Sequence, residues 1–103
     1  MWYSLDLDSN DAFKELIRKH YPNEFRKCPE FLRHKTSVIE PGLLLKNGIK
    51  LHKIVQRPRE FVIGRPQAYH SGFNTGYNIA EAVNFALEPW LELAKKGIDH
   101  CKC

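Results

Sequence analysis

The first third of the chain carries a helical pattern of hydrophobic positions. Between Ser9 and Tyr21 the apolar residues recur every three to four positions, at Ala12, Phe13, Leu16, Ile17 and Tyr21. This spacing predicts an amphipathic helix, for which Asp8 and Ser9 are the N-cap candidates. Pro22 follows the last apolar position and is expected to end the helix, since proline interrupts the hydrogen-bond ladder of a helix interior.

Short elements follow this helix. Residues 30–34 and 42–47 are each expected to form a brief helical piece, and Gly48 supplies a C-cap for the second. The intervening TSVIEP is rich in β-branched residues and predicts an extended segment that ends at Pro41.

The second half of the chain has a β-type pattern. KLHKIVQ (50–56) and FVIG (61–64) are expected to be strands joined by a turn at RPRE, and RPQAYH is a return segment broken by proline. A final helix is predicted from Pro89 to Gly97, with proline in its first turn and glycine as its stop. The pattern as a whole predicts an α+β protein with a mainly β core and flanking helices.

Composition narrows the class of protein without naming an activity. The 103 residues suit one small domain or a piece of a larger one, and 43% apolar with 27% charged residues is typical of a globular protein. No apolar run is long enough to span a membrane, and the first residues lack the order of a signal peptide. The net charge of +4 is spread among acidic residues, which disfavours direct nucleic-acid binding but is compatible with an anionic assembly such as chromatin.

The cysteines suggest a metal site. There are three of them, so disulfide pairing would leave one thiol over. Cys28, Cys101 and Cys103 together with His34 would complete a Cys3His set, which is a closed structural zinc site. The spacing is not that of a common zinc finger, and three buried thiols without metal remain the alternative. His100 is a competing ligand beside Cys101, ranked below His34.

Several longer segments carry a family resemblance. They are, in chain order, WYSL at the start, FLRHK in the middle, FVIGRPQAYH, and YHSGFNTGYNIAEAVNFAL. Together they resemble the JmjC domain of histone lysine demethylases, and Cys-x5-His followed by a terminal Cys-x-Cys is similar to the zinc site of the JMJD2-type members. The resemblance implies a double-stranded β-helix (a cupin-like jelly roll) and a dioxygenase that uses iron(II) and 2-oxoglutarate to demethylate a methylated histone tail in the nucleus.

The resemblance also implies residue roles. His70 corresponds to an iron ligand on a strand, and Lys35 to a lysine near the approach of dioxygen. Trp2 lies beside the cosubstrate in this comparison, and Asn74 presents a polar side chain towards cosubstrate and metal. The stretch that lines the methyl-lysine pocket corresponds to Ala82, Val83 and Asn84, and the structural zinc ligands to Cys28, His34, Cys101 and Cys103. Apart from His70 and the zinc set, each of these residues could equally be structural.

The sequence also departs from the family pattern. No histidine is followed two positions later by Asp or Glu, so the His-x-Asp/Glu pair of the iron site is missing, as is the lysine that binds 2-oxoglutarate. Arg59 stands where relatives carry glycine, and a left-handed backbone there would cost about 1 kcal/mol. Gly64 and Arg65 also differ from the usual pair.

These departures lead to two hypotheses. In the first, residues 1–103 are the C-terminal portion of a JmjC domain whose N-terminal half is absent, part of a histone lysine demethylase and inactive as this fragment. In the second, the chain is a non-catalytic, zinc-stabilised JmjC-like module associated with chromatin.

Overall fold

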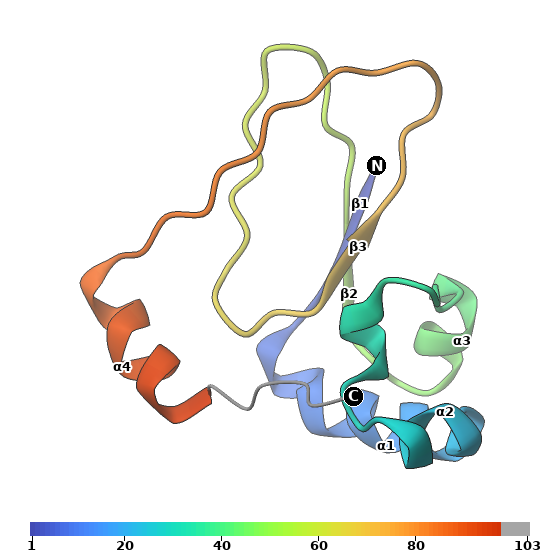
Figure 1. The fold of residues 1–103 in the computed structure, drawn as a ribbon. Helices are drawn as coiled ribbons and strands as arrows, with labels where there is room; N and C mark the ends of the chain where they lie inside the picture. The colour runs from blue at the N-terminus through green and yellow to red at the C-terminus, as the bar shows by residue number, and fades with distance from the viewer. Residues whose placement is uncertain (98–103) are drawn as a thin grey trace.

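The computed structural model describes residues 1–97 (Figure 1). In chain order its elements are β1 (Trp2–Leu5), η1 (Leu7–Ser9), α1 (Asn10–His20), α2 (Pro22–Lys27), η2 (Phe31–His34), α3 (Pro41–Lys46), β2 (Leu51–Ile54), β3 (His70–Gly72) and α4 (Glu88–Gly97). Within residues 1–97, no helix combines the length and the apolar character that a membrane crossing requires.

The strands form one antiparallel sheet in the order β2-β1-β3. The first strand of the chain therefore lies in the middle, between two strands that come much later in the sequence. Trp2 pairs with Ile54 on one side and with Gly72 on the other, and Ser4 pairs with His70. The β1–β3 pairing continues past the strand ends, because the Phe73 amide donates to the Met1 carbonyl at 3.0 Å.

The hydrophobic core lies between the sheet and the helices α1, α2, η2 and α3, which gather at one end of the sheet (Figure 1). Its buried members are Leu5, Phe13, Leu16, Ile17, Cys28, Phe31, Leu44 and Ile49. Helix α1 contributes three of them, as its amphipathic pattern predicted. Tyr69, immediately before β3, packs its ring against Phe13 with a centroid distance of 4.7 Å. The start of β3 is thereby fixed to the helical side of the molecule.

The helix predictions are confirmed, with one correction. The helix expected over residues 9–21 is α1, the piece expected at 42–47 is α3, and the C-terminal helix is α4. Gly48, with a φ of 71°, adopts the left-handed conformation expected after a helix. Pro22 does end α1, but it also begins α2, which was not predicted. Proline is favoured in the first turn of a helix because its missing N–H would have no intrahelical partner there.

The strand predictions are only partly confirmed. The segment at 50–56 contains β2, whereas residues 61–64 and 36–40 form no strand in the structure. A strand exists only where a neighbour accepts its hydrogen bonds, and the described residues offer these two segments none. The α+β class is therefore confirmed, but a β-dominated second half is not. Residues 73–87 run as an irregular arc from β3 to α4 (Figure 1).

The aromatic side chains of the arc do not form part of the core. Phe73, Tyr77 and Phe85 are exposed, Tyr77 completely, whereas the jelly roll implied by the resemblance would enclose such side chains. The described residues contain three short strands, which do not close around these side chains.

Candidate functional site

The site predicted around His70 is built from the sheet. His70 begins β3, as expected for a ligand carried by a strand, and the Trp2 ring of the neighbouring strand lies 6.1 Å from its imidazole, centroid to centroid, at 55°. Gly72 faces Trp2 in the register. A Cβ atom at Gly72 would lie 2.6 Å from Cε3 of Trp2, so only glycine leaves room for the indole in this position. Two of the predicted site residues, Trp2 and His70, are thus brought together.

The backbone sets the orientation of the His70 ring. Its Nδ1 lies 3.3 Å from the carbonyl oxygen of Ala68. A carbonyl can only accept, so Nδ1 carries the proton and donates, and the Nε2 lone pair stays available. The His70 side chain is exposed, and a metal-binding histidine typically has this arrangement, in which one ring nitrogen is anchored and the other faces outward.

Gln56 joins this site without having been foreseen from the sequence. Trp2 Nε1 donates a hydrogen bond to Gln56 Oε1 at 2.9 Å, across 54 residues of chain. The Gln56 amide nitrogen in turn donates to the Glu60 carbonyl at 2.9 Å. No local pattern marks such a residue, because the contact depends on β2 and β1 lying side by side.

The other residues implied by the resemblance are not assembled with His70. Asn74 lies beyond β3 and its side-chain oxygen accepts from Asn78 at 3.3 Å. Lys35 follows η2 with a left-handed backbone (φ 58°), and within residues 1–97 its side chain forms no hydrogen bond or ion pair with the sheet. The stretch predicted to line the methyl-lysine pocket is exposed on the irregular arc and comprises Ala82, Val83 and Asn84. These roles remain predictions.

Two members of the predicted zinc set lie close together. Cys28 Sγ is 3.7 Å from His34 Nε2. A tetrahedral zinc ion with bonds of about 2.3 Å to sulfur and about 2.0–2.1 Å to nitrogen would separate two such ligands by about 3.6 Å. Cys28 and His34 therefore fit the ion. The cysteines at 101 and 103 lie outside the described residues, and within residues 1–97 no three metal-binding side chains are grouped.

Disulfide pairing is the alternative use of the Cys28 sulfur. A disulfide and a zinc–thiolate bond make competing use of this atom, because only the thiolate binds the metal. The zinc content of the protein and its number of free thiols can therefore distinguish a zinc site at Cys28 from a disulfide bond.

The described residues supply only one of the ligands that an iron site would need. His70 offers one anchored imidazole, and no Asp, Glu or second His joins it to form a group of three within residues 1–97. Iron(II) in oxygenases of this kind is bound by two histidines and one carboxylate. His70 can thus supply one of the three ligands.

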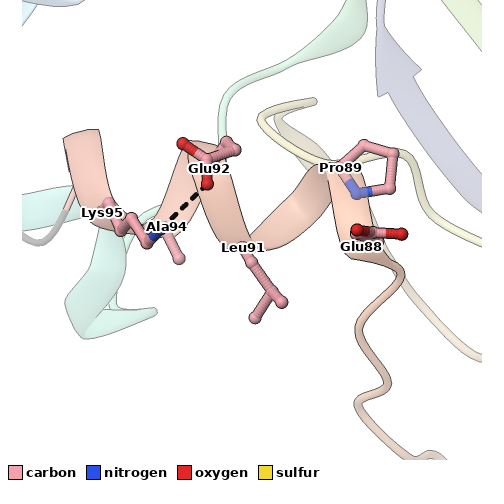
Figure 2. A pocket seen from close by; sticks show the side chains of 6 residues that line it. All are labelled: Glu88, Pro89, Leu91, Glu92, Ala94 and Lys95. Atoms are coloured by element: carbon pink, nitrogen blue, oxygen red, sulfur yellow. Dashed lines mark hydrogen bonds and ion pairs between the residues drawn. The ribbon is translucent and has the colours of Figure 1, made fainter.

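A separate shallow pocket lies along α4 (Figure 2). Its lining comes from this helix alone, namely Glu88, Pro89, Leu91, Glu92, Ala94 and Lys95. Lys95 and Glu92 form an exposed ion pair at 2.8 Å, one turn apart on the helix. None of the predicted site residues lines this pocket, and we assign no function to it.

The geometry defines a small α+β unit that presents one anchored histidine from a β-strand. Comparison with known proteins gives the family. The JmjC domain, hydroxylase, matches residues 1–85, and the chain belongs to this family. It is 39% identical over 102 residues to "Probable lysine-specific demethylase 4F" of Homo sapiens and 37% identical over 102 residues to "Lysine-specific demethylase 4D" of Rattus norvegicus. The predicted resemblance to JMJD2-type demethylases is confirmed.

The alignments differ in how much of each protein they cover. They include 99% of this chain but only 16% of the human relative and 20% of the rat relative. The chain therefore spans at most a fifth of the length of these two proteins, and their activity is not transferred to it directly.

Proposed function

We propose that this chain is the C-terminal portion of the JmjC domain of an iron(II)- and 2-oxoglutarate-dependent histone lysine demethylase. The observation that carries the proposal is His70, which is exposed on β3 with Nδ1 held by the Ala68 carbonyl and Nε2 available to a metal. The family match and the lysine-specific demethylases among its relatives support the substrate class. A methylated histone tail, chromatin and the nucleus are the corresponding partner and location.

The residues of this chain would contribute defined parts of that reaction. Iron(II), when bound, would supply the oxidising chemistry with 2-oxoglutarate and dioxygen. His70 would provide one ligand, and Trp2 would cover one side of it. Lys35 would lie near the approach of dioxygen, and Asn74 would present its polar side chain towards the cosubstrate and the metal. Beside them, the stretch that comprises Ala82, Val83 and Asn84 would border the methylated lysine, once the remaining strands of a cupin-like jelly roll pack against the exposed arc.

Because only one iron ligand is recognisable, the 103 residues alone are expected to be inactive. Incubation with iron(II), ascorbate, 2-oxoglutarate and a trimethylated histone peptide should give neither succinate nor formaldehyde. A longer chain that adds a His-x-Asp or His-x-Glu strand upstream should decarboxylate 2-oxoglutarate, and His70→Ala should abolish this reaction. Formaldehyde release by the 103-residue chain, or full activity of the longer His70→Ala protein, would contradict the assignment of His70.

The second candidate function is a non-catalytic, zinc-stabilised module that associates with chromatin. This hypothesis needs no iron ligands beyond the 103 residues, in which no His-x-Asp/Glu pair occurs. The coding sequence upstream of Met1 separates the two hypotheses, because only the enzyme requires the missing ligands and a cation for 2-oxoglutarate.

Both hypotheses include a structural zinc ion held by Cys28, His34, Cys101 and Cys103. The separation of 3.7 Å between Cys28 Sγ and His34 Nε2 supports it. Protein purified under reducing conditions should contain one zinc per chain, and Cys101→Ser should lose most of it, since structural zinc sites bind with about 10–16 kcal/mol. If the protein instead carries no zinc and gains two free thiols on reduction, Cys28 serves a disulfide and the zinc proposal is wrong.

A further inference from the structure

We infer that Gln56 is a positioning residue that holds the Trp2 indole beside His70. The inference rests on the proposed function in one respect, namely that the orientation of His70 matters because its Nε2 binds a metal. The contacts themselves come from the structure. Gln56 follows β2, Trp2 lies in the central strand and His70 lies in the third strand, so the three residues connect all the strands of the sheet.

Both the oxygen and the nitrogen of the Gln56 side-chain amide form hydrogen bonds. Its oxygen accepts from the Trp2 indole and its nitrogen donates to the Glu60 carbonyl, both at 2.9 Å. These partners are not interchangeable, because an indole N–H can only donate and a carbonyl can only accept. The orientation of the amide is therefore fixed, and an acceptor is always aimed at Trp2.

The Glu60 carbonyl is itself held in place by a closed turn. The Arg57 amide donates to a Glu60 carboxylate oxygen at 3.0 Å, and the Glu60 amide donates back to the Arg57 carbonyl at 3.2 Å. Arg59 lies inside this turn with a φ of 67°. Gln56 is thus connected to a defined turn, although its side chain is exposed.

Strand β3 limits the space available to the Trp2 indole. Gly72 lies directly against the six-membered ring of Trp2, where a Cβ atom would be only 2.6 Å away. The indole therefore has Gly72 beneath it and a hydrogen bond to Gln56 at its nitrogen, and these two restraints keep its ring 6.1 Å from the imidazole of His70. The Ala68 carbonyl holds the same imidazole through Nδ1. Removing the Gln56 acceptor should free the indole to rotate away from His70.

The test uses the 103-residue chain labelled with 15N in its tryptophan side chains. Trp2 and Trp90 are its two tryptophans, and Trp90→Phe assigns their indole signals. Gln56→Met removes the acceptor with little change in volume. Gln56→Glu keeps an acceptor for Trp2 but loses the donor to the Glu60 carbonyl. Gln67→Met is the matched control, because the Gln67 side chain forms no hydrogen bond within residues 1–97.

In Gln56→Met we expect the Trp2 indole proton signal to move upfield and its exchange with water to accelerate about five-fold, as for the loss of one net hydrogen bond. The nuclear Overhauser effect between the Trp2 and His70 rings should fall by more than half. The melting temperature should change little, since all these side chains but Trp2 are exposed. Gln56→Glu should restore most of the Trp2 signal, and Gln67→Met should leave both readouts unchanged.

The inference is overturned if Gln56→Met leaves the Trp2 signal and the ring–ring effect unchanged, or if Gln67→Met changes them equally. Neither readout requires iron or turnover. A longer chain that fails to decarboxylate 2-oxoglutarate would therefore refute the proposed function while the positioning by Gln56 stands. Conversely, an active longer chain with an unaltered Trp2 signal in Gln56→Met would refute the positioning alone.

Discussion

The contact between Gly72 and Trp2 gives the most direct test of the structure. In Gly72→Ala the new Cβ would lie 2.6 Å from Cε3 of Trp2 and 2.9 Å from the Met1 carbonyl oxygen. Real Cβ atoms do not approach other heavy atoms this closely, so the strands must shift. Neither neighbour can yield freely, because the Met1 carbonyl accepts from the Phe73 amide and the Trp2 indole is bound by Gln56.

The magnitude follows from this geometry. Overpacking by one methyl group costs about 1–3 kcal/mol when the surroundings cannot relax. For a domain of this size, each kcal/mol of destabilisation lowers the melting temperature by about 4–8 °C. Gly72 does not have a left-handed backbone, so the destabilising part of the effect comes from the clash alone. We therefore expect Gly72→Ala to destabilise the chain by about 1–3 kcal/mol.

Urea unfolding followed by far-ultraviolet circular dichroism measures this change. Two glycines serve as matched controls, since a Cβ atom at Gly64 or Gly76 meets nothing within 4 Å and neither has a positive φ. Alanine at these positions should be neutral or stabilise by about 0.4–1 kcal/mol through the unfolded chain. If Gly72→Ala proved as stable as Gly76→Ala, the pairing of β1 with β3 in this register would be wrong.

Three further stability predictions follow from single residues. Arg59→Gly should stabilise the chain by about 1 kcal/mol in urea unfolding, because Arg59 has a φ of 67° that glycine adopts without strain; a loss of stability would contradict this. Phe13→Ala should cost about 3–5 kcal/mol, since its ring is buried against Tyr69, and a cost below about 1 kcal/mol would place Phe13 outside the core. Ser9→Ala should cost about 1–2 kcal/mol in thermal unfolding, because the buried hydroxyl accepts from the Lys50 amide at 3.2 Å; an unchanged midpoint would refute this contact.

Local patterns predicted the helices well. The apolar spacing of α1 and the proline and glycine at the ends of α3 and α4 act within a few residues, and these elements formed where they were expected. Ser9 shows the limit of such patterns. It occupies the N-cap position of α1 as predicted, but its side chain makes no capping bond and instead accepts from Lys50, 41 residues away.

The sequence by itself determined the family and every α-helix but α2, because motif spacing and helical periodicity are properties of neighbouring residues. It also singled out His70, whose role in metal binding stays a prediction. The tertiary structure alone decided that WYSL lies between β2 and β3, that Gly72 is needed beneath the Trp2 indole, and that Gln56 binds that indole. It also decided that FVIG, although rich in strand-forming residues, is not a strand among the described residues. The physical reason is common to all four cases: sheet pairing and the contacts across it are made between residues far apart in the chain, and no local pattern specifies which distant segment will supply the partner.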